Sequence, residues 1–141
     1  DVFRESGYFR TGDLVEICGD NADFYKLVGR CKDIRNRGGM KISPVELDIA
    51  LEAHPDIVES AVCAYPDDRL GEKICACVLM KPGVELIGMQ ALQDYLLGLG
   101  LAKFKLPERI EAIEALPRNA LGKVQRFVLE EQIGKIIATE A

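Results

Sequence analysis

Two apolar segments joined by a short polar turn constrain the fold of this chain more than any other feature. The segments run from Ile57 to Tyr65 and from Lys73 to Lys81, and the turn between them reads Pro66-Asp67-Asp68-Arg69-Leu70-Gly71-Glu72. Two β-rich segments on either side of such a turn predict a hairpin of antiparallel strands. Both strands are apolar on both faces, so we expect helices to cover at least part of the sheet.

Helical patterns flank this hairpin in the sequence. Ser43-Pro44-Val45-Glu46 predicts a helix start, because serine can cap, proline suits the first helical position and Glu46 can complete a capping box. This helix should end near His54, since Pro55 disfavours helical geometry in the residue before it. We expect further helices over 90–99 and 127–137, and further strands over 24–28 and 109–114. The mixture predicts an α+β fold, with a small antiparallel sheet flanked by helices.

The composition is that of a globular domain and excludes several kinds of function. The 141 residues are 48% hydrophobic and 29% charged. A net charge of −5 argues against general nucleic-acid binding, which relies on a basic surface. No apolar run approaches the ~20 residues of a membrane span, and no secretory leader is visible. We therefore expect a cytoplasmic protein without a membrane span, and its start at Asp1 suggests a piece of a longer chain.

The five cysteines do not follow the spacing of a zinc or redox motif. Cys18, Cys31 and Cys63 stand alone, whereas Cys75 and Cys77 are two residues apart in an apolar strand and so share a face. With one histidine in the chain, we expect no metal site. The cysteines are interpreted as small hydrophobes in a reducing compartment.

Three short motifs follow one another along the chain. They read Gly7-Tyr8-Phe9-Arg10-Thr11-Gly12-Asp13-Leu14, then Gly29-Arg30-Cys31-Lys32-Asp33 leading to Gly38-Gly39, then Pro117-Arg118-Asn119-Ala120-Leu121-Gly122-Lys123-Val124-Gln125-Arg126. The third is not a Walker phosphate loop, which would need Gly at 117 and Ser or Thr at 124. Together the motifs resemble the C-terminal part of the adenylate-forming enzymes: acyl- and aryl-CoA synthetases, nonribosomal-peptide adenylation domains and beetle luciferases.

This resemblance implies a domain organisation and a reaction. Residues 1–31 would end the N-terminal AMP-binding domain, and residues 32–141 would form the mobile C-terminal domain. In the acyl-CoA synthetases, a carboxylic acid attacks ATP, with Mg²⁺ present, to give an acyl-adenylate and pyrophosphate. After the domain rotates, the CoA thiol attacks the adenylate and releases acyl-CoA and AMP. The implied partners are the acid, CoA and the N-terminal domain, so this piece alone should be inactive.

The resemblance also implies which residues bind the nucleotide and act on it. Asp13 would bind the ribose of ATP, although an aspartate after Thr-Gly can also simply cap a turn. Arg30 would lie beside the ribose, where its fork of donors suits oxygen atoms. Lys123 would be the catalytic residue, because its charge would contact the substrate carboxylate and the α-phosphate during adenylation.

A second group of residues would serve the domain rotation. Lys32 would be the hinge, whose backbone torsions change as the C-terminal domain swings. Gly38 and Gly39 would line the CoA tunnel in the thioester-forming orientation, where glycine permits close backbone approach. Glu46 matches the family motif too, but the capping box gives it a structural role.

Two alternatives to a CoA synthetase stay open. An adenylation domain that loads a carrier-protein thiol shares the three motifs, but the segment Phe104-Lys105-Leu106-Pro107-Glu108-Arg109-Ile110-Glu111 resembles the CoA-synthetase version. A non-catalytic interaction module could also have kept this fold. The acid itself is not readable, because the family's acyl pocket lies in the N-terminal domain.

Overall fold

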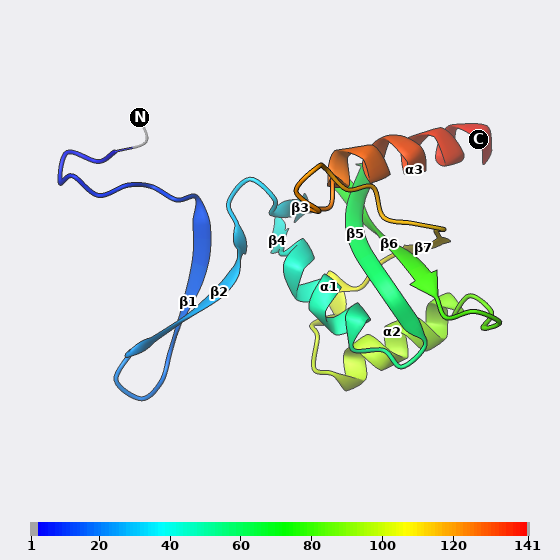
Figure 1. Ribbon diagram of the computed structural model, residues 1–141, viewed down its shortest axis with the longest axis horizontal. Coiled ribbons are helices and arrows are strands. Elements are labelled where there is room, and N and C mark those ends of the chain that lie inside the picture. The colour runs from blue at the N-terminus through cyan, green and yellow to red at the C-terminus, as the bar shows by residue number, and fades with distance from the viewer. Residues whose placement is uncertain (1–2, 141) are drawn as a thin grey trace.

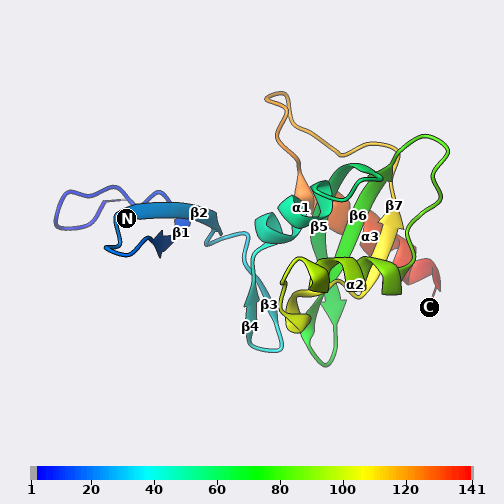
Figure 2. The ribbon, with the colours of Figure 1, turned by 90° about the horizontal axis from the view of Figure 1, so that it is seen from below.

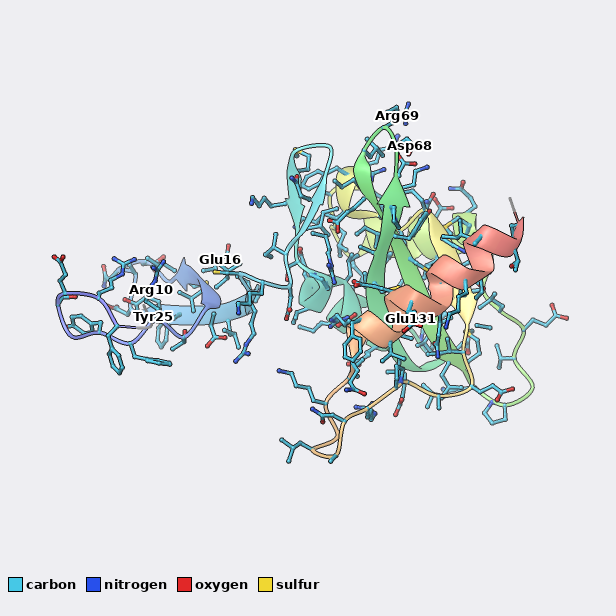
Figure 3. All side chains as sticks on the ribbon, turned by 90° about the horizontal axis from the view of Figure 1, so that it is seen from above. Arg10, Glu16, Tyr25, Asp68, Arg69 and Glu131 are labelled. Carbon is cyan, nitrogen blue, oxygen red and sulfur yellow. The ribbon has the colours of Figure 1, made fainter. Side chains whose placement is uncertain are left out.

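The computed structural model describes residues 3–140 and begins with a projecting two-stranded hairpin. Strands β1 (Asp13–Cys18) and β2 (Phe24–Arg30) pair antiparallel and stand apart from the larger body of the molecule in Figure 1. Strand β1 was not expected, since the sequence predicted no strand before residue 24. Figure 3 shows Glu16 and Tyr25 on this hairpin, far from the central sheet.

The larger body is built on one five-stranded sheet. Strands β5 (Ile57–Asp67) and β6 (Gly71–Met80) form the predicted antiparallel hairpin. Strands β3 (Arg35–Arg37) and β4 (Met40–Ile42) form a smaller hairpin that joins β6. Strand β7 (Arg109–Ala112) also pairs with β6, but runs parallel to it. The α+β class is confirmed, and the sheet is mixed because the chain crosses over through a helix between β6 and β7.

Helices cover both faces of this sheet, as the apolar hairpin requires. Helices α1 (Pro44–Glu52) and α2 (Met89–Gly98) pack on one face and α3 (Arg126–Glu140) on the other (Figures 1 and 2). A short 3₁₀ helix, η1 (Lys103–Lys105), precedes β7. Alternate residues of β5 and β6 enter two separate cores. One contains Leu47, Leu51, Val62, Ile74, Val78, Leu92 and Leu96, and the other Ala61, Cys63, Cys75, Cys77, Leu129 and Ile133.

The start of α1 differs from the predicted capping box. The helix begins at Pro44 as expected, but the side chain of Ser43 makes no cap hydrogen bond. The Ser43 hydroxyl instead donates to the carbonyl oxygen of Val28 at 2.6 Å, and Glu46 accepts from the Lys105 ammonium at 2.6 and 2.8 Å. Both side chains that could have capped the helix therefore bond to residues distant in sequence. The Ser43 hydrogen bond also joins α1 to β2.

Candidate functional site

A cleft of about 1050 Å³ lies where β2, its connection to β3, the loop over 117–125 and the start of α3 meet. It is lined by Asp13, Arg30, Lys32 and Lys123, which come from all three sequence motifs. Arg35, Arg118 and Arg126 line it as well, so cations dominate its polar wall. A concave surface of this sign concentrates anions such as the phosphates of a nucleotide.

Asp13 and Arg30 face one another across the β1–β2 pair at the rim of this cleft. They are partners in the strand register, and Arg30 Nε donates to Asp13 Oδ1 at 3.0 Å. The backbone N–H of Asp13 donates to Thr11 Oγ1 at 3.1 Å, which fixes the start of the strand. Within residues 3–140, Asp13 Oδ2 and the terminal nitrogens of Arg30 have no hydrogen-bond partner. The pair therefore offers both acceptors and donors to a polyhydroxylated ligand.

Lys32 lies in the short connection between the projecting hairpin and the larger body. Its side chain is exposed, and the turn around it is closed by the Asp33 N–H, which donates to the Arg30 carbonyl at 3.0 Å. Just before it, Gly29 has φ +147°, and a Cβ at this position would lie 2.8 Å from Ser43 Oγ. A side chain here would push the Ser43 hydroxyl away from the Val28 carbonyl, and the φ itself favours glycine. The connection joins the projecting hairpin to the larger body, and the role of Lys32 as the hinge stays a prediction.

The backbone of Lys123 is held by hydrogen bonds, whereas its side chain makes none with the described residues. It lies on an exposed loop that closes through a bridge between Arg118 and Val124 and through the Gln125 N–H, which donates to the Pro117 carbonyl at 2.8 Å. Its ammonium makes no hydrogen bond or ion pair with any residue that the structure describes. A charged group on a flexible stem is thus presented to the cleft.

Two ion pairs that sequence reasoning missed attach this loop to the body. Arg126 bonds both carboxylate oxygens of Asp48 and donates to the Val62 carbonyl at 2.7 Å. Arg35 pairs with Glu130 one turn further along α3. Burial raises the pKa of Asp48 and of Glu130, while the neighbouring arginine opposes the shift in each case. The third motif contains Arg126, but nothing in the sequence identified Asp48 as its partner.

Gly38 and Gly39 lie away from the cleft, at the tip of the β3–β4 hairpin. Their φ angles of +56° and +87° suit a two-residue type I′ turn, which glycine adopts readily. Figure 2 shows this hairpin and the loop before α3 at opposite ends of the larger body. The structure therefore separates the two glycines from Lys123, and their role in a CoA tunnel stays a prediction.

Three of the cysteines meet in the core between the sheet and α3. Cys63, Cys75 and Cys77 are fully buried, and their sulfur atoms all lie within 4.8 Å of one another. Cys63 stands alone in the sequence, and only the strand register places it opposite Cys75. The buried side chains around them are aliphatic, among them Ala61, Leu116, Leu129 and Ile133, and Tyr65 packs at the edge of this cluster. These surroundings suit the expected role of small buried hydrophobes.

Comparison with known proteins gives the family. The sequence model described as AMP-binding enzyme C-terminal domain matches residues 46–123, more than half of the chain. The chain belongs to this family. The resemblance seen in the three motifs is thereby confirmed, and the α+β fold is that of the AMP-binding C-terminal domain.

Individual relatives include a CoA ligase and an acid–AMP ligase. A medium-chain fatty-acid–CoA ligase from Escherichia coli (strain K12) is 40% identical over 129 residues, which are 92% of this chain and 22% of that protein. A 2,3-dihydroxybenzoate-AMP ligase from Bacillus subtilis (strain 168) is 38% identical over 133 residues, 94% of this chain and 24% of that protein. Among solved structures, ATP-bound MatB from Rhodopseudomonas palustris has a TM-score of 0.80 at 38% identity, covering 96% of this chain and 26% of the other.

The chain spans about a quarter of the length of those relatives. Among residues 3–140, none of the helices combines the length and the apolar character needed to cross a membrane.

Proposed function

We propose that this chain is the C-terminal part of an ATP-dependent acyl-CoA synthetase. The full enzyme would convert a carboxylic acid, ATP and CoA into acyl-CoA, AMP and pyrophosphate through an acyl-adenylate. One observation carries the proposal: the fold gathers Asp13, Arg30 and Lys123, from motifs at the two ends of the chain, around one cationic cleft. The relatives support it, since one is named a CoA ligase and another is solved with ATP bound.

The cleft suggests how these residues divide the work in adenylation. Asp13 accepts hydrogen bonds from the two vicinal hydroxyls of the ribose, and Arg30 holds Asp13 in place while its free nitrogens reach neighbouring oxygens. Lys123 places its ammonium between the attacking carboxylate and the α-phosphate. Negative charge gathers there in the transition state, so a preorganised cation lowers the barrier.

Magnesium is not expected to be held by this part of the enzyme. The carboxylates that line the cleft are those of Asp13, Asp33 and Glu130, and two of them are already paired with arginine. The described residues therefore do not form the cluster of free oxygen ligands that Mg²⁺ prefers. We assign the Mg²⁺ that accompanies ATP to the phosphates and to the larger domain.

The projecting hairpin supports the proposal of an N-terminal domain as partner. Its large apolar side chains are exposed by 53% to 70%; they are Val15, Ile17, Phe24, Tyr25 and Leu27. The strand register places Val15 opposite Leu27 and Ile17 opposite Tyr25 on one face of the hairpin, and an exposed apolar face of this kind indicates a surface that packs against other protein. We propose that β1 and β2 belong to the N-terminal AMP-binding domain, that the boundary falls at Lys32, and that Gly38 and Gly39 serve the CoA step after rotation.

The acceptor of the acyl group separates this proposal from its main alternative. An adenylation domain that loads a carrier protein would share the adenylation cleft, and the relatives include an acid–AMP ligase. ATP–pyrophosphate exchange by the intact enzyme tests adenylation in both cases, and its absence with a broad panel of acids would favour a non-catalytic module. Thioester formation with free CoA, compared with a phosphopantetheinylated carrier protein, then identifies the acceptor. CoA is the expected one.

Replacing Asp13 with alanine should raise the KM for ATP in the intact enzyme by roughly 10- to 100-fold. The expected loss is that of hydrogen bonds to a charged acceptor, about 1.5–3 kcal/mol. The KM for the acid should change little, because Asp13 contacts only the nucleotide. Glu16→Ala is the matched control, since Glu16 lies on the same strand but outside this cleft. An unchanged KM for ATP in Asp13→Ala would remove Asp13 from the nucleotide site.

Replacing Lys32 with proline should separate the two half-reactions. Proline fixes φ near −65° and disfavours helical geometry at Cys31, the residue before it. The Lys32 N–H donates to no described residue, so the effect should come through these backbone restrictions and not through a lost hydrogen bond. We expect pyrophosphate exchange to persist and thioester formation to fall strongly. Lys32→Ala leaves the torsions free and should retain both activities. Equal loss of both half-reactions in the proline variant, measured separately, would place the pivot elsewhere.

A further inference from the structure

We propose that Asn119 is a positioning residue for Lys123: its side-chain amide holds the lysine loop closed from within. This inference rests on the proposed adenylation function and adds a residue to that site. Asn119 is exposed and lines the cleft, but its proposed role does not require contact with the substrate. Its role would be exerted through the backbone of Lys123.

The hydrogen bonds of Asn119 show how the loop is closed. The side-chain oxygen Oδ1 accepts from the backbone N–H of Leu121 at 3.0 Å and from the backbone N–H of Lys123 at 2.9 Å. Both partners are donors, so the oxygen of the amide has to face them, and the orientation of the side chain is determined. One side-chain atom thus binds the backbone of the catalytic lysine directly.

The backbone of Asn119 closes the same turn from the other side. Its N–H donates to the Lys123 carbonyl at 2.9 Å, and its carbonyl accepts from the Gly122 N–H at 2.9 Å. Gly122 has φ +78°, a backbone conformation that residues with a side chain rarely adopt. The chain reverses its direction at this glycine. Asn119 therefore contacts the loop through main chain and side chain together, and Lys123 is bound at both its N–H and its carbonyl.

Arg118 ties this closed turn to the body of the domain. One guanidinium nitrogen of Arg118 donates to the Gly122 carbonyl at 2.9 Å, and another lies 3.3 Å from Glu59 on β5. The loop is thus closed by hydrogen bonds and joined to β5 by an exposed ion pair, while the ammonium of Lys123 has no partner among the described residues. The effect of a catalytic charge depends on its position. Removal of the hydrogen bonds that close this turn should therefore lower the rate of adenylation even when Lys123 is present.

The test is a set of variants in the intact enzyme, with the two half-reactions assayed separately. Asn119→Ala removes the side-chain acceptor and should lower kcat of adenylation by about 10- to 100-fold, the scale of a misplaced catalytic group. The KM for ATP should change less than kcat, because Asp13 and Arg30 lie outside this loop and keep their contacts with the ribose. Thioester formation from supplied acyl-adenylate should stay within about threefold, because Lys123 has rotated away by then. Asn119→Asp keeps an acceptor at the same position but adds a negative charge to the cleft, so it should restore only part of the rate. Leu121→Ala, on the same loop and 93% exposed, is the matched control and should behave as wild type.

A double-mutant cycle distinguishes positioning from a general structural role. If Asn119 acts through Lys123, Asn119→Ala should cause no further loss of adenylation in a Lys123→Ala background. Equal losses in both backgrounds, or equal losses in both half-reactions, would overturn the proposal.

A measurement that does not depend on activity tests the hydrogen bonds themselves. The amide protons of Leu121 and Lys123 should exchange with solvent several-fold faster in Asn119→Ala than in wild type, and at wild-type rates in Asn119→Asp. Unchanged exchange in Asn119→Ala would refute the role of the Asn119 side chain in closing the loop, even if activity falls. If wild type lacked adenylation altogether while the exchange result held, the proposed function would fail and the loop geometry would stand.

Discussion

Replacing Lys123 with alanine in the intact enzyme is expected to lower the rate of adenylation by at least ~10²-fold. The estimate corresponds to removal of one preorganised charge from a transition state. Lys123 is exposed, and its ammonium has no partner among the described residues, so the substitution should leave the stability of the domain unchanged. ATP–pyrophosphate exchange, with unfolding monitored in parallel, measures both expectations.

The second half-reaction gives the control for the Lys123 prediction. Thioester formation from chemically supplied acyl-adenylate should be nearly unaffected, because Lys123 would have rotated away from the site by then. Lys123→Gln should behave like the alanine variant, since both lack the charge. Lys135→Ala removes an exposed lysine of α3 that lies outside the cleft and should leave both rates unchanged. Equal loss of the two half-reactions in Lys123→Ala would contradict the division of roles between two domain orientations.

Replacing Asp48 with alanine is expected to destabilise the folded domain by about 3 kcal/mol. The substitution leaves the Arg126 guanidinium largely buried without its carboxylate, and breaking one side of such a pair is costly. The side chains of Arg126 and Asp48 are only 19% and 15% exposed, so water cannot replace the lost partner well. Urea unfolding of the 141-residue chain measures the free-energy change. In the intact enzyme adenylation should fall too, because Arg126 attaches the Lys123 loop to α1 and β5.

An exposed ion pair on the same helix is the matched control for the Asp48 prediction. Glu131 and Lys135 pair at 2.9 Å across one turn of α3, with side chains 64% and 74% exposed, and Figure 3 shows Glu131 on the outer side of that helix. Glu131→Ala should change the free energy of unfolding by no more than about 0.5 kcal/mol, the usual value for such pairs. An effect of Asp48→Ala as small as that of Glu131→Ala would show that Arg126 finds other partners. The double variant Asp48→Ala/Arg126→Met should recover part of the loss, because it leaves no buried charge.

Local signals in the sequence were sufficient for the main elements of the fold. The polar turn between two apolar segments predicted β5 and β6. Pro44 marked the start of α1, and Pro55 predicted its end to within two residues. These features depend on neighbouring residues, which act in the same way wherever the chain later packs. The three motifs likewise identified the family, because each is contiguous and keeps its residue order.

Predictions that needed a distant partner were the ones that changed. The capping box at Ser43 failed because Val28 and Lys105, far away in sequence, bound the two side chains more favourably. Strand β7 made the sheet mixed, since its neighbour was decided by a crossover and not by its own four residues. The cluster of Cys63 with Cys75 and Cys77 required the register of two strands.

The sequence by itself determined the family, the α+β class and the residue types available for nucleotide chemistry, because each of these resides in short contiguous patterns. The tertiary structure alone decided which of those residues meet. It gathered Asp13, Arg30, Lys32 and Lys123 at one cleft, kept Gly38 and Gly39 away from it, and supplied Asp48 as the partner that anchors Arg126. Such contacts join residues through packing and charge neutralisation across the fold, and a linear pattern does not encode which distant side chain will be the neighbour.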